Sequence, residues 1–211
     1  MPNGLPDVGF NYLNHVTIEQ QIVNYLNYTS SQLKNSDLTI IATEGKLQAT
    51  PFGKCRIAGR ADRIDRFGGI VRVIDYKTGH VDNADLKVPI RHKSESHLDY
   101  LRQIPDKALQ LLLYKYMYLK ENPSLRPEQV TGAIHGLKYA HAIDFGLSKT
   151  TPKKDDSDAD VNFLDDSTFL DDMERLIEAA VTEMLDTATP FVQAQDDKKC
   201  RYCDFKGICK R

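Results

Sequence analysis

The sequence predicts an α/β fold in which helices flank a central mixed sheet that contains an antiparallel meander. Three strand-like segments follow one another over residues 38–77 and are separated by short turn sequences, which is typical of a meander. A further strand-like segment near residue 134 lies between two segments whose apolar residues recur at helical spacing. A chain of 211 residues is long enough to bury a hydrophobic core between such layers.

Three segments have the pattern of helices. The first covers residues 17–34, where Thr17 and Gln20 resemble a capping box. The second follows Pro105 and ends at Asn122, and the third begins at Thr168 with a continuous apolar stripe. Residues 82–103 have mixed charge without a period and are predicted to form a loop, and residues 148–160 are predicted to form a solvated linker.

The composition excludes several classes of protein. Lysine and arginine total 28 and acidic residues 30, which gives a net charge of −2, so a nucleic-acid partner would need a local basic patch. No apolar run approaches the roughly 18 residues of a membrane helix, and the first residues lack the pattern of a signal peptide. We therefore expect a cytoplasmic protein without membrane association, in which the four cysteines favour metal chemistry over disulfides.

Acidic residues cluster in the stretch from Gly59 to Gly79, although its two strand segments are otherwise suited to burial. Side chains alternate along a strand, so Asp75 shares one side of the segment 70–77 with valines and with Lys77. A two-residue turn at Gly68 and Gly69 sets a register in which Asp62 faces Asp75.

Two opposed carboxylates are destabilising unless a cation neutralises them. Asp62 and Asp75, together with the backbone carbonyl of Tyr76 and water, would form the all-oxygen ligand set that suits Mg²⁺ or Mn²⁺, and Lys77 would lie beside the ion. The sequence therefore predicts a metal site at these residues.

The alternative is that the acidic residues form surface ion pairs on an edge hairpin. The same register places Asp65 opposite Arg72, so we interpret Asp65 as the partner of that arginine. Asp62 and Asp75 have apolar neighbours, which favours the metal site for them.

The motifs "GRADRID", "VIDYKTG" and "QLLLY", in this order and spacing, resemble the nuclease domain of the RecB and AddB family, a branch of the PD-(D/E)XK nuclease superfamily. The resemblance runs from about Glu44 to the C-terminus and implies a restriction-endonuclease-like core. It implies that Asp62 is the first motif aspartate, Asp75 the acidic residue of the (D/E)XK element and Lys77 its lysine.

The resemblance also assigns Gln110 and Tyr114 to a Q-x-x-x-Y motif. They lie four residues apart on one face of the predicted helix, where an amide and a phenol could hold DNA or orient the lysine. The residues alone would favour a polar stripe beside the core.

The function implied by the resemblance is that of a Mg²⁺- or Mn²⁺-dependent DNA nuclease, expected to be an exonuclease, within a helicase–nuclease that processes DNA ends in recombinational repair. No P-loop is present, so a helicase would be supplied by another region or subunit. Two alternatives stay open: a stand-alone RecB-like exonuclease of the CRISPR-associated type, and a non-catalytic DNA-binding module of the same fold.

One part of the family pattern lacks a convincing counterpart. Members usually carry a metal-binding histidine on an upstream helix, whereas His15 is expected to precede the first helix and to be exposed. We expect residues 1–36 to be the truncated start of a longer parent, residues 37–190 to be the nuclease core and residues 191–211 to be a cysteine-rich tail.

The tail contains Cys200, Cys203 and Cys209 in a C-x2-C-x5-C spacing, which indicates a metal site. The resemblance to AddB-type nucleases implies three ligands of a [4Fe–4S] cluster. The fourth ligand would be Cys55 or, as we favour, a residue upstream of this chain, and zinc is the minor alternative.

Local basic stretches occur at residues 91–103, 148–154 and 198–211. Each could follow a DNA backbone or be a solvated loop.

Overall fold

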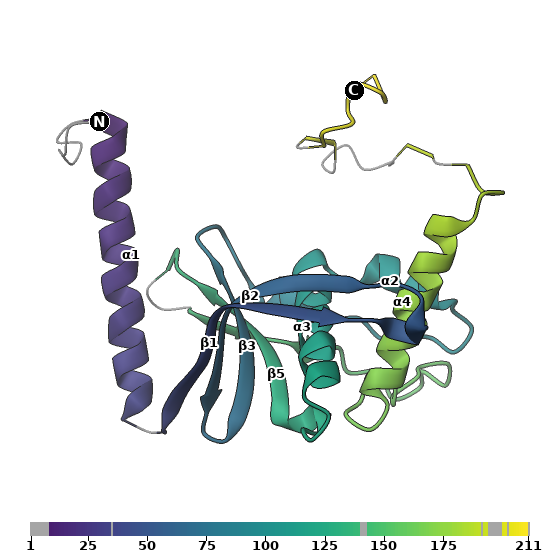
Figure 1. The fold of residues 1–211 in the computed structure, drawn as a ribbon, viewed down its shortest axis with the longest axis horizontal. Helices are drawn as coiled ribbons and strands as arrows, with labels where there is room; N and C mark the ends of the chain where they lie inside the picture. Colours follow the sequence, from purple (N-terminus) through teal and green to yellow (C-terminus); the bar gives the residue numbers. More distant parts are fainter. Residues whose placement is uncertain are drawn as a thin grey trace.

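The protein forms a mixed sheet between helices, which confirms the predicted fold class. The computed structural model describes residues 9–34, 36–139, 143–190, 192–193, 200–201 and 203–210. Its five-stranded sheet has the order β1-β2-β3-β5-β6, and β4 and β7 form a separate parallel pair. Figure 1 shows the sheet between α1 on one side and α3 and α4 on the other. The strands are β1 (Leu38–Ala49), β2 (Ile57–Phe67), β3 (Ile70–Lys77), β4 (Lys87–Val88), β5 (Val130–Gly136), β6 (Asp144–Gly146) and β7 (Ser148–Lys149), and the α-helices are α1 (Gly9–Leu33), α2 (His97–Gln103), α3 (Asp106–Glu121) and α4 (Phe169–Leu185).

The meander has the predicted register. β2 and β3 are antiparallel and pair from Phe67–Ile70 to Arg63–Ile74. Gly68 and Gly69 form the turn with φ of 55° and 86°, a backbone region that both residues of this tight hairpin turn need and that glycine adopts without steric cost. β5 then pairs with β3 in parallel, which makes the sheet mixed.

Three predicted elements differ from the structure, and one is the predicted linker over residues 148–160, which begins with β7 and contains the buried Ala159. α1 already includes Gly9, so His15 lies inside the helix and is half-buried, not in front of it and exposed. The segment predicted to be a loop over residues 82–103 contains α2, which begins where the Ser96 hydroxyl accepts a hydrogen bond from the Asp99 backbone at 3.1 Å. This serine cap was a local helix signal that the lack of apolar periodicity concealed.

The main core lies between the sheet and the helices α3 and α4. Val71 and Val73 of β3 are almost fully buried, as is Met173 of α4. α3 turns an apolar face to the strands, with Ala108, Leu111, Leu112 and Met117 inside. This packing fixes the position of α3 above β3.

The hairpin of β1 and β2 bends at Glu44, whose φ is 51°. Beyond it, residues 45–49 pair with residues 57–61, and Figure 1 shows this part, here called the β-arm, passing over α3. Leu47 and Ala61 of the β-arm are buried, whereas Lys46 and Arg60 are exposed. The bend thus lays one face of the β-arm on the core and leaves the other in solvent.

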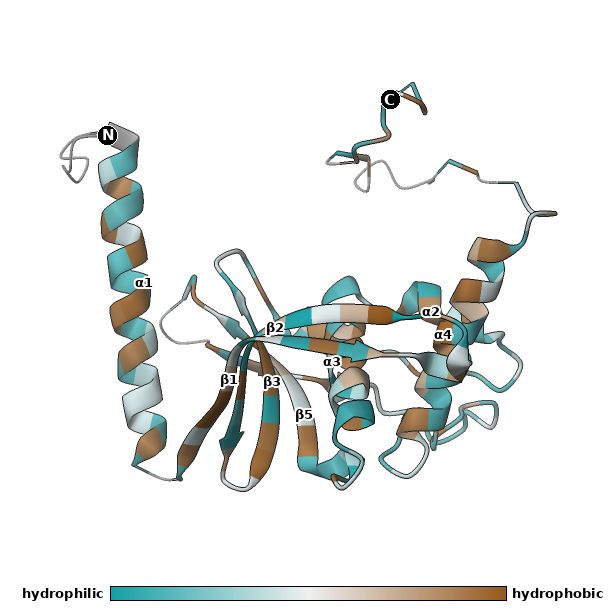
Figure 2. Cartoon of the chain, viewed as in Figure 1, coloured by the Kyte–Doolittle hydropathy of each residue, from teal (hydrophilic) through white to brown (hydrophobic). Residues whose placement is uncertain are grey.

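α1 contacts the opposite face of the sheet through polar side chains. Tyr25 bonds to Tyr76 and His135, and Tyr28 bonds to Asp144. Many of its apolar side chains are exposed, as the brown segments along α1 in Figure 2 illustrate; they include Leu13, Val16, Ile18, Ile22, Val23 and Leu26.

Among the described residues, none of the helices combines the length and the apolar character needed to cross a bilayer.

A substitution at Gly132 of β5 would test how closely α3 packs on the sheet. An added Cβ would lie 2.8 Å from the Leu111 Cβ and 3.3 Å from its carbonyl oxygen, so Gly132→Ala must push α3 away from β5. We expect this variant to lower the free energy of unfolding by about 1–3 kcal/mol in urea denaturation. The control Gly146→Ala has open space at its Cβ and should change this free energy by less than about 0.5 kcal/mol. Equal losses of unfolding free energy in the two variants would contradict the close packing of α3 on β5.

Candidate active site

Asp75 is a buried acid at the end of β3, under α3. Only 5% of its surface is exposed. Its Oδ1 accepts a hydrogen bond of 3.0 Å from the Gln110 amide, and its Oδ2 lies 2.7 Å from the Lys77 ammonium. The ammonium is not aligned as a hydrogen-bond donor, so Oδ2 is buried with an ion-pair partner but without a hydrogen bond.

Asp62 lies where the strand pairing of β2 is interrupted. The β1–β2 ladder passes from Gly45–Ala61 to Thr43–Arg63, and the described β2–β3 ladder ends at Arg63–Ile74. Asp62 therefore does not form the expected ladder pair with Asp75. Its carboxylate instead accepts a hydrogen bond of 2.6 Å from the backbone N–H of Tyr76, the residue after Asp75. The side chain is half-buried and remains beside the Asp75–Lys77 segment.

Gln110 and Tyr114 connect α3 to both strands. The Gln110 amide donates to Asp75 and to the Tyr114 hydroxyl, each at 3.0 Å, and that hydroxyl donates to the Arg60 carbonyl at 2.8 Å. Gly59 permits this approach, because a Cβ there would lie 2.8 Å from the Tyr114 ring. Gln110 thus contacts the acid, whereas the sequence suggested that it could hold DNA or orient the lysine.

The acidic residues suit a divalent cation. Asp75 Oδ2 is removed from water and is approached only by a positive charge, and carboxylate oxygens are the ligands that Mg²⁺ and Mn²⁺ prefer. Across the described ranges, no group of three His, Cys, Asp or Glu side chains could hold a metal. An ion at Asp62 and Asp75 would therefore need a backbone oxygen, such as that of Tyr76, and water to complete its shell.

The comparison with protein families agrees with this arrangement. Residues 10–210 match the PD-(D/E)XK nuclease superfamily. The chain belongs to this superfamily. Its members are typically metal-dependent nucleases, and the acids, lysine and glutamine described above lie within the matched range.

Other comparisons add little. No curated protein sequence matches the chain. A solved structure titled "Crystal structure of SSO0001" is 20% identical, with 92% of this chain and 70% of that chain covered at a TM-score of 0.37. A likeness at this level carries no argument about function.

Asp65 belongs to a buried ion-pair group on the other side of the sheet. Arg72 binds its carboxylate with two hydrogen bonds of 2.8 and 2.9 Å, and Arg63 donates a further one. The predicted pairing with Arg72 is confirmed, but the predicted surface position is wrong, because Asp65 is fully buried. Its charge neutralises Arg63 and, together with Asp144, neutralises Arg72, so Asp65 has a structural role.

Tyr76 is anchored on this same side by residues that the sequence analysis missed. Its hydroxyl lies 3.0 Å from that of Tyr25, which lies 3.1 Å from His135 Nδ1 and accepts from Arg63 at 2.9 Å. Burial lowers the pKa of His135 to about 4 and raises the pKa of Tyr25, so both are neutral near pH 7. The only signal in the sequence was a histidine inside an otherwise apolar strand.

The cysteine tail forms turns in its described part. The Cys203 amide donates to the Cys200 carbonyl at 3.2 Å, and the Cys209 amide donates to the Phe205 carbonyl at 3.4 Å. The described residues do not gather three metal ligands here, and Tyr202 lies outside them. The predicted three-cysteine site is thus not assembled in the described structure. Cys55 lies separately, shortly before β2.

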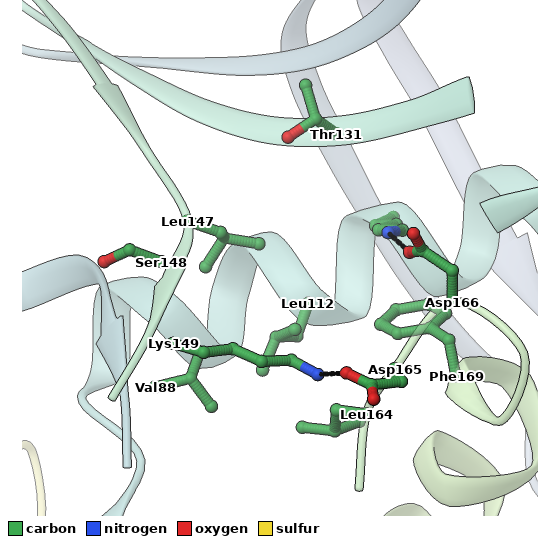
Figure 3. A pocket seen from close by; sticks show the side chains of 11 residues that line it. Val88, Leu112, Thr131, Leu147, Ser148, Lys149, Leu164, Asp165, Asp166 and Phe169 are labelled. Carbon is green, nitrogen blue, oxygen red and sulfur yellow. Dashed lines mark hydrogen bonds and ion pairs between the residues drawn. The ribbon is translucent and has the colours of Figure 1, made fainter. Parts of the chain in front are cut away.

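A hollow of about 220 Å³ lies on another side of α3 and is lined by none of the predicted site residues. Figure 3 shows the Lys149 amine directed at Asp165, and Lys115 forms an ion pair of 3.5 Å with Asp166. These charges neutralise one another, so this hollow is a weaker candidate for catalysis than the Asp75–Lys77 segment.

The free energy of unfolding of two Asn variants can distinguish the structural aspartate, Asp65, from the candidate site aspartate, Asp62. Asp65→Asn leaves the buried Arg63 without a counter-charge and leaves Arg72 with only Asp144, 3.7 Å away, so we expect it to lower the free energy of unfolding by about 3 kcal/mol. Asp62→Asn keeps an oxygen that can accept from Tyr76 and should cost less than about 1 kcal/mol. Urea unfolding of both variants measures this, and a larger loss for Asp62→Asn would contradict the assignment.

Proposed function

We propose that the chain is the metal-dependent nuclease domain of a RecB- or AddB-like helicase–nuclease that processes DNA ends in recombinational repair. The observation that carries the proposal is the buried Asp75 carboxylate, which contacts the Lys77 ammonium at 2.7 Å and the Gln110 amide at 3.0 Å. Membership of the PD-(D/E)XK nuclease superfamily supports hydrolysis of a phosphodiester as the reaction.

Asp62, Asp75 and the Tyr76 carbonyl would hold Mg²⁺ or Mn²⁺. When bound, this ion supplies positive charge for the phosphate oxygens and lowers the pKa of a coordinated water. Asp75 is preorganised for this role, because Gln110 fixes one of its oxygens and leaves the other facing a cation.

Lys77 is placed to act on water and phosphate. Its side chain is 34% exposed, so the ammonium is accessible from solvent while it neutralises Asp75. The ammonium would orient or help to deprotonate the attacking water and would stabilise the negative charge on the phosphorus oxygens.

Gln110 and Tyr114 are proposed to position the acid rather than to react. Their hydrogen bonds tie Asp75 to the backbone of the β-arm at Arg60. This chain of contacts limits the rotation of the carboxylate.

The central test replaces Asp75 and Lys77. Asp75→Asn and Lys77→Ala should each reduce Mg²⁺-dependent cleavage of linear DNA by about 100-fold or more, because each removes charge from the reaction centre. EDTA should abolish cleavage by the unsubstituted chain, and an exonuclease would spare covalently closed circular DNA.

Lys87→Ala is the matched control, since Lys87 is an exposed lysine of β4 outside the site, and it should retain activity. Circular dichroism checks that the variants are folded. Undiminished cleavage by either site variant would refute the mechanism, and DNA binding without cleavage by the unsubstituted chain would favour the non-catalytic module.

The cysteine tail is proposed to supply three ligands of a [4Fe–4S] cluster, supported by the spacing of Cys200, Cys203 and Cys209. Chain purified without air should then contain iron and acid-labile sulfide in equal amounts and absorb visible light, and Cys203→Ala should remove both signals. Cys55→Ala should do the same only if Cys55 is the fourth ligand. A colourless, iron-free chain would contradict the cluster in this chain.

A further inference from the structure

The exposed face of the β-arm, here called its outer face, is basic. Lys46 and Arg60 are exposed on this face, and Arg56, the residue directly before β2, is exposed next to it and is counted with it below. They line a hollow of about 450 Å³ whose other polar side chains are Gln48 and Glu121.

Two of these basic residues face each other directly. Lys46 of β1 pairs with Arg60 of β2 in the antiparallel ladder, and like charges in such a pair are destabilising. Glu44 approaches Arg60 at 3.5 Å, but both side chains are more than half exposed, so the pair contributes little. Among the described residues, neither Lys46 nor Arg56 has an ion-pair partner.

The single acid of the hollow is already engaged. Glu121 accepts a hydrogen bond of 2.8 Å from the Gln48 backbone N–H. Three basic side chains thus face one acid in this hollow, and the outer face has an excess of positive charge that includes the directly opposed Lys46 and Arg60.

The basic face leads to the candidate active site. Arg60 precedes Asp62 by two residues of β2, a rise of about 7 Å, and Arg56, directly before the first residue of β2, precedes Asp62 by six residues, or about 20 Å of extended chain. The Arg60 carbonyl is also joined through Tyr114 and Gln110 to Asp75. At 3.4 Å per nucleotide, 20 Å corresponds to about six stacked nucleotides.

We propose that Lys46, Arg56 and Arg60 on the outer face of the β-arm bind the phosphates of the DNA strand adjacent to the bond that is cleaved. The inference rests on the proposed nuclease function and adds the path of the substrate to it. Contacts between basic side chains and phosphates are independent of sequence, as a nuclease acting on DNA ends requires. The basic segments at residues 91–103, 148–154 and 198–211 are not needed for this path.

Binding of a fluorescein-labelled single-stranded oligonucleotide in EDTA, measured by anisotropy between 50 and 200 mM NaCl, tests the path without cleavage. The double variant Lys46→Gln/Arg56→Gln should lower affinity about fivefold or more. It should also reduce the slope of log affinity against log salt by about 1.4, or 0.7 for each phosphate that is no longer neutralised.

The matched control is Lys153→Gln/Lys154→Gln, which removes two exposed lysines from the loop after β7. It should leave both affinity and slope unchanged. An unchanged affinity in the β-arm variant, an equal loss in the control, or no binding by the unsubstituted chain would each overturn the proposal.

A stability measurement separates binding from a structural role. Lys46→Gln relieves the repulsion with Arg60, so its unfolding midpoint should be equal to or higher than that of the unsubstituted chain while its affinity for DNA is lower. A lower midpoint would indicate a structural residue and would count against the path. Loss of binding in the β-arm variant together with absent cleavage in Mg²⁺ by the unsubstituted chain would support DNA binding by the outer face and refute the nuclease function, and with it the role of this face as a path to a cleaved bond.

Discussion

A buried carboxylate next to an ammonium group is the constraint on which the rest of this structure depends. Asp75 is 5% exposed, and a carboxylate removed from water in this way is costly unless partners such as the Lys77 cation and the Gln110 amide compensate it. Both partners come from fixed elements, since Lys77 follows Asp75 in β3 and Gln110 lies on α3. The packing of α3 on the sheet is therefore part of the electrostatics of the site as well as of the hydrophobic core.

The segment Asp75–Lys77 is held from both faces of the sheet. On one face, Gln110 binds Asp75, and on the other the Tyr76 hydroxyl lies 3.0 Å from Tyr25 of α1. The Tyr76 backbone N–H binds Asp62, so a single residue joins the two acidic side chains and α1. The positively charged outer face of the β-arm begins two residues before Asp62, which relates the proposed DNA path to the same short region of β2.

Several features were predictable from sequence because they depend on local rules. Strand alternation and the Gly68–Gly69 turn were sufficient for the register of β2 and β3, including the contact between Asp65 and Arg72. The apolar stripe after Thr168 was sufficient for α4. The resemblance to known nucleases singled out Gln110 and Tyr114, whose hydrogen bonds join α3 to the site.

By itself, the sequence determined the order of the long strands and helices, though not α2 or the short strands, together with the hairpin register and the choice of acids and lysine as site candidates, because these follow from periodicity and turn chemistry over a few residues. Only the tertiary structure decided that Asp62 reaches the Tyr76 N–H, that Asp65 is buried with Arg63, and that His135 is buried beside Tyr25. It also decided that the β-arm bends at Glu44 and passes over α3. These features depend on contacts between residues that are distant in the sequence and on the burial of their charges. A local sequence pattern encodes neither the contacts nor the burial.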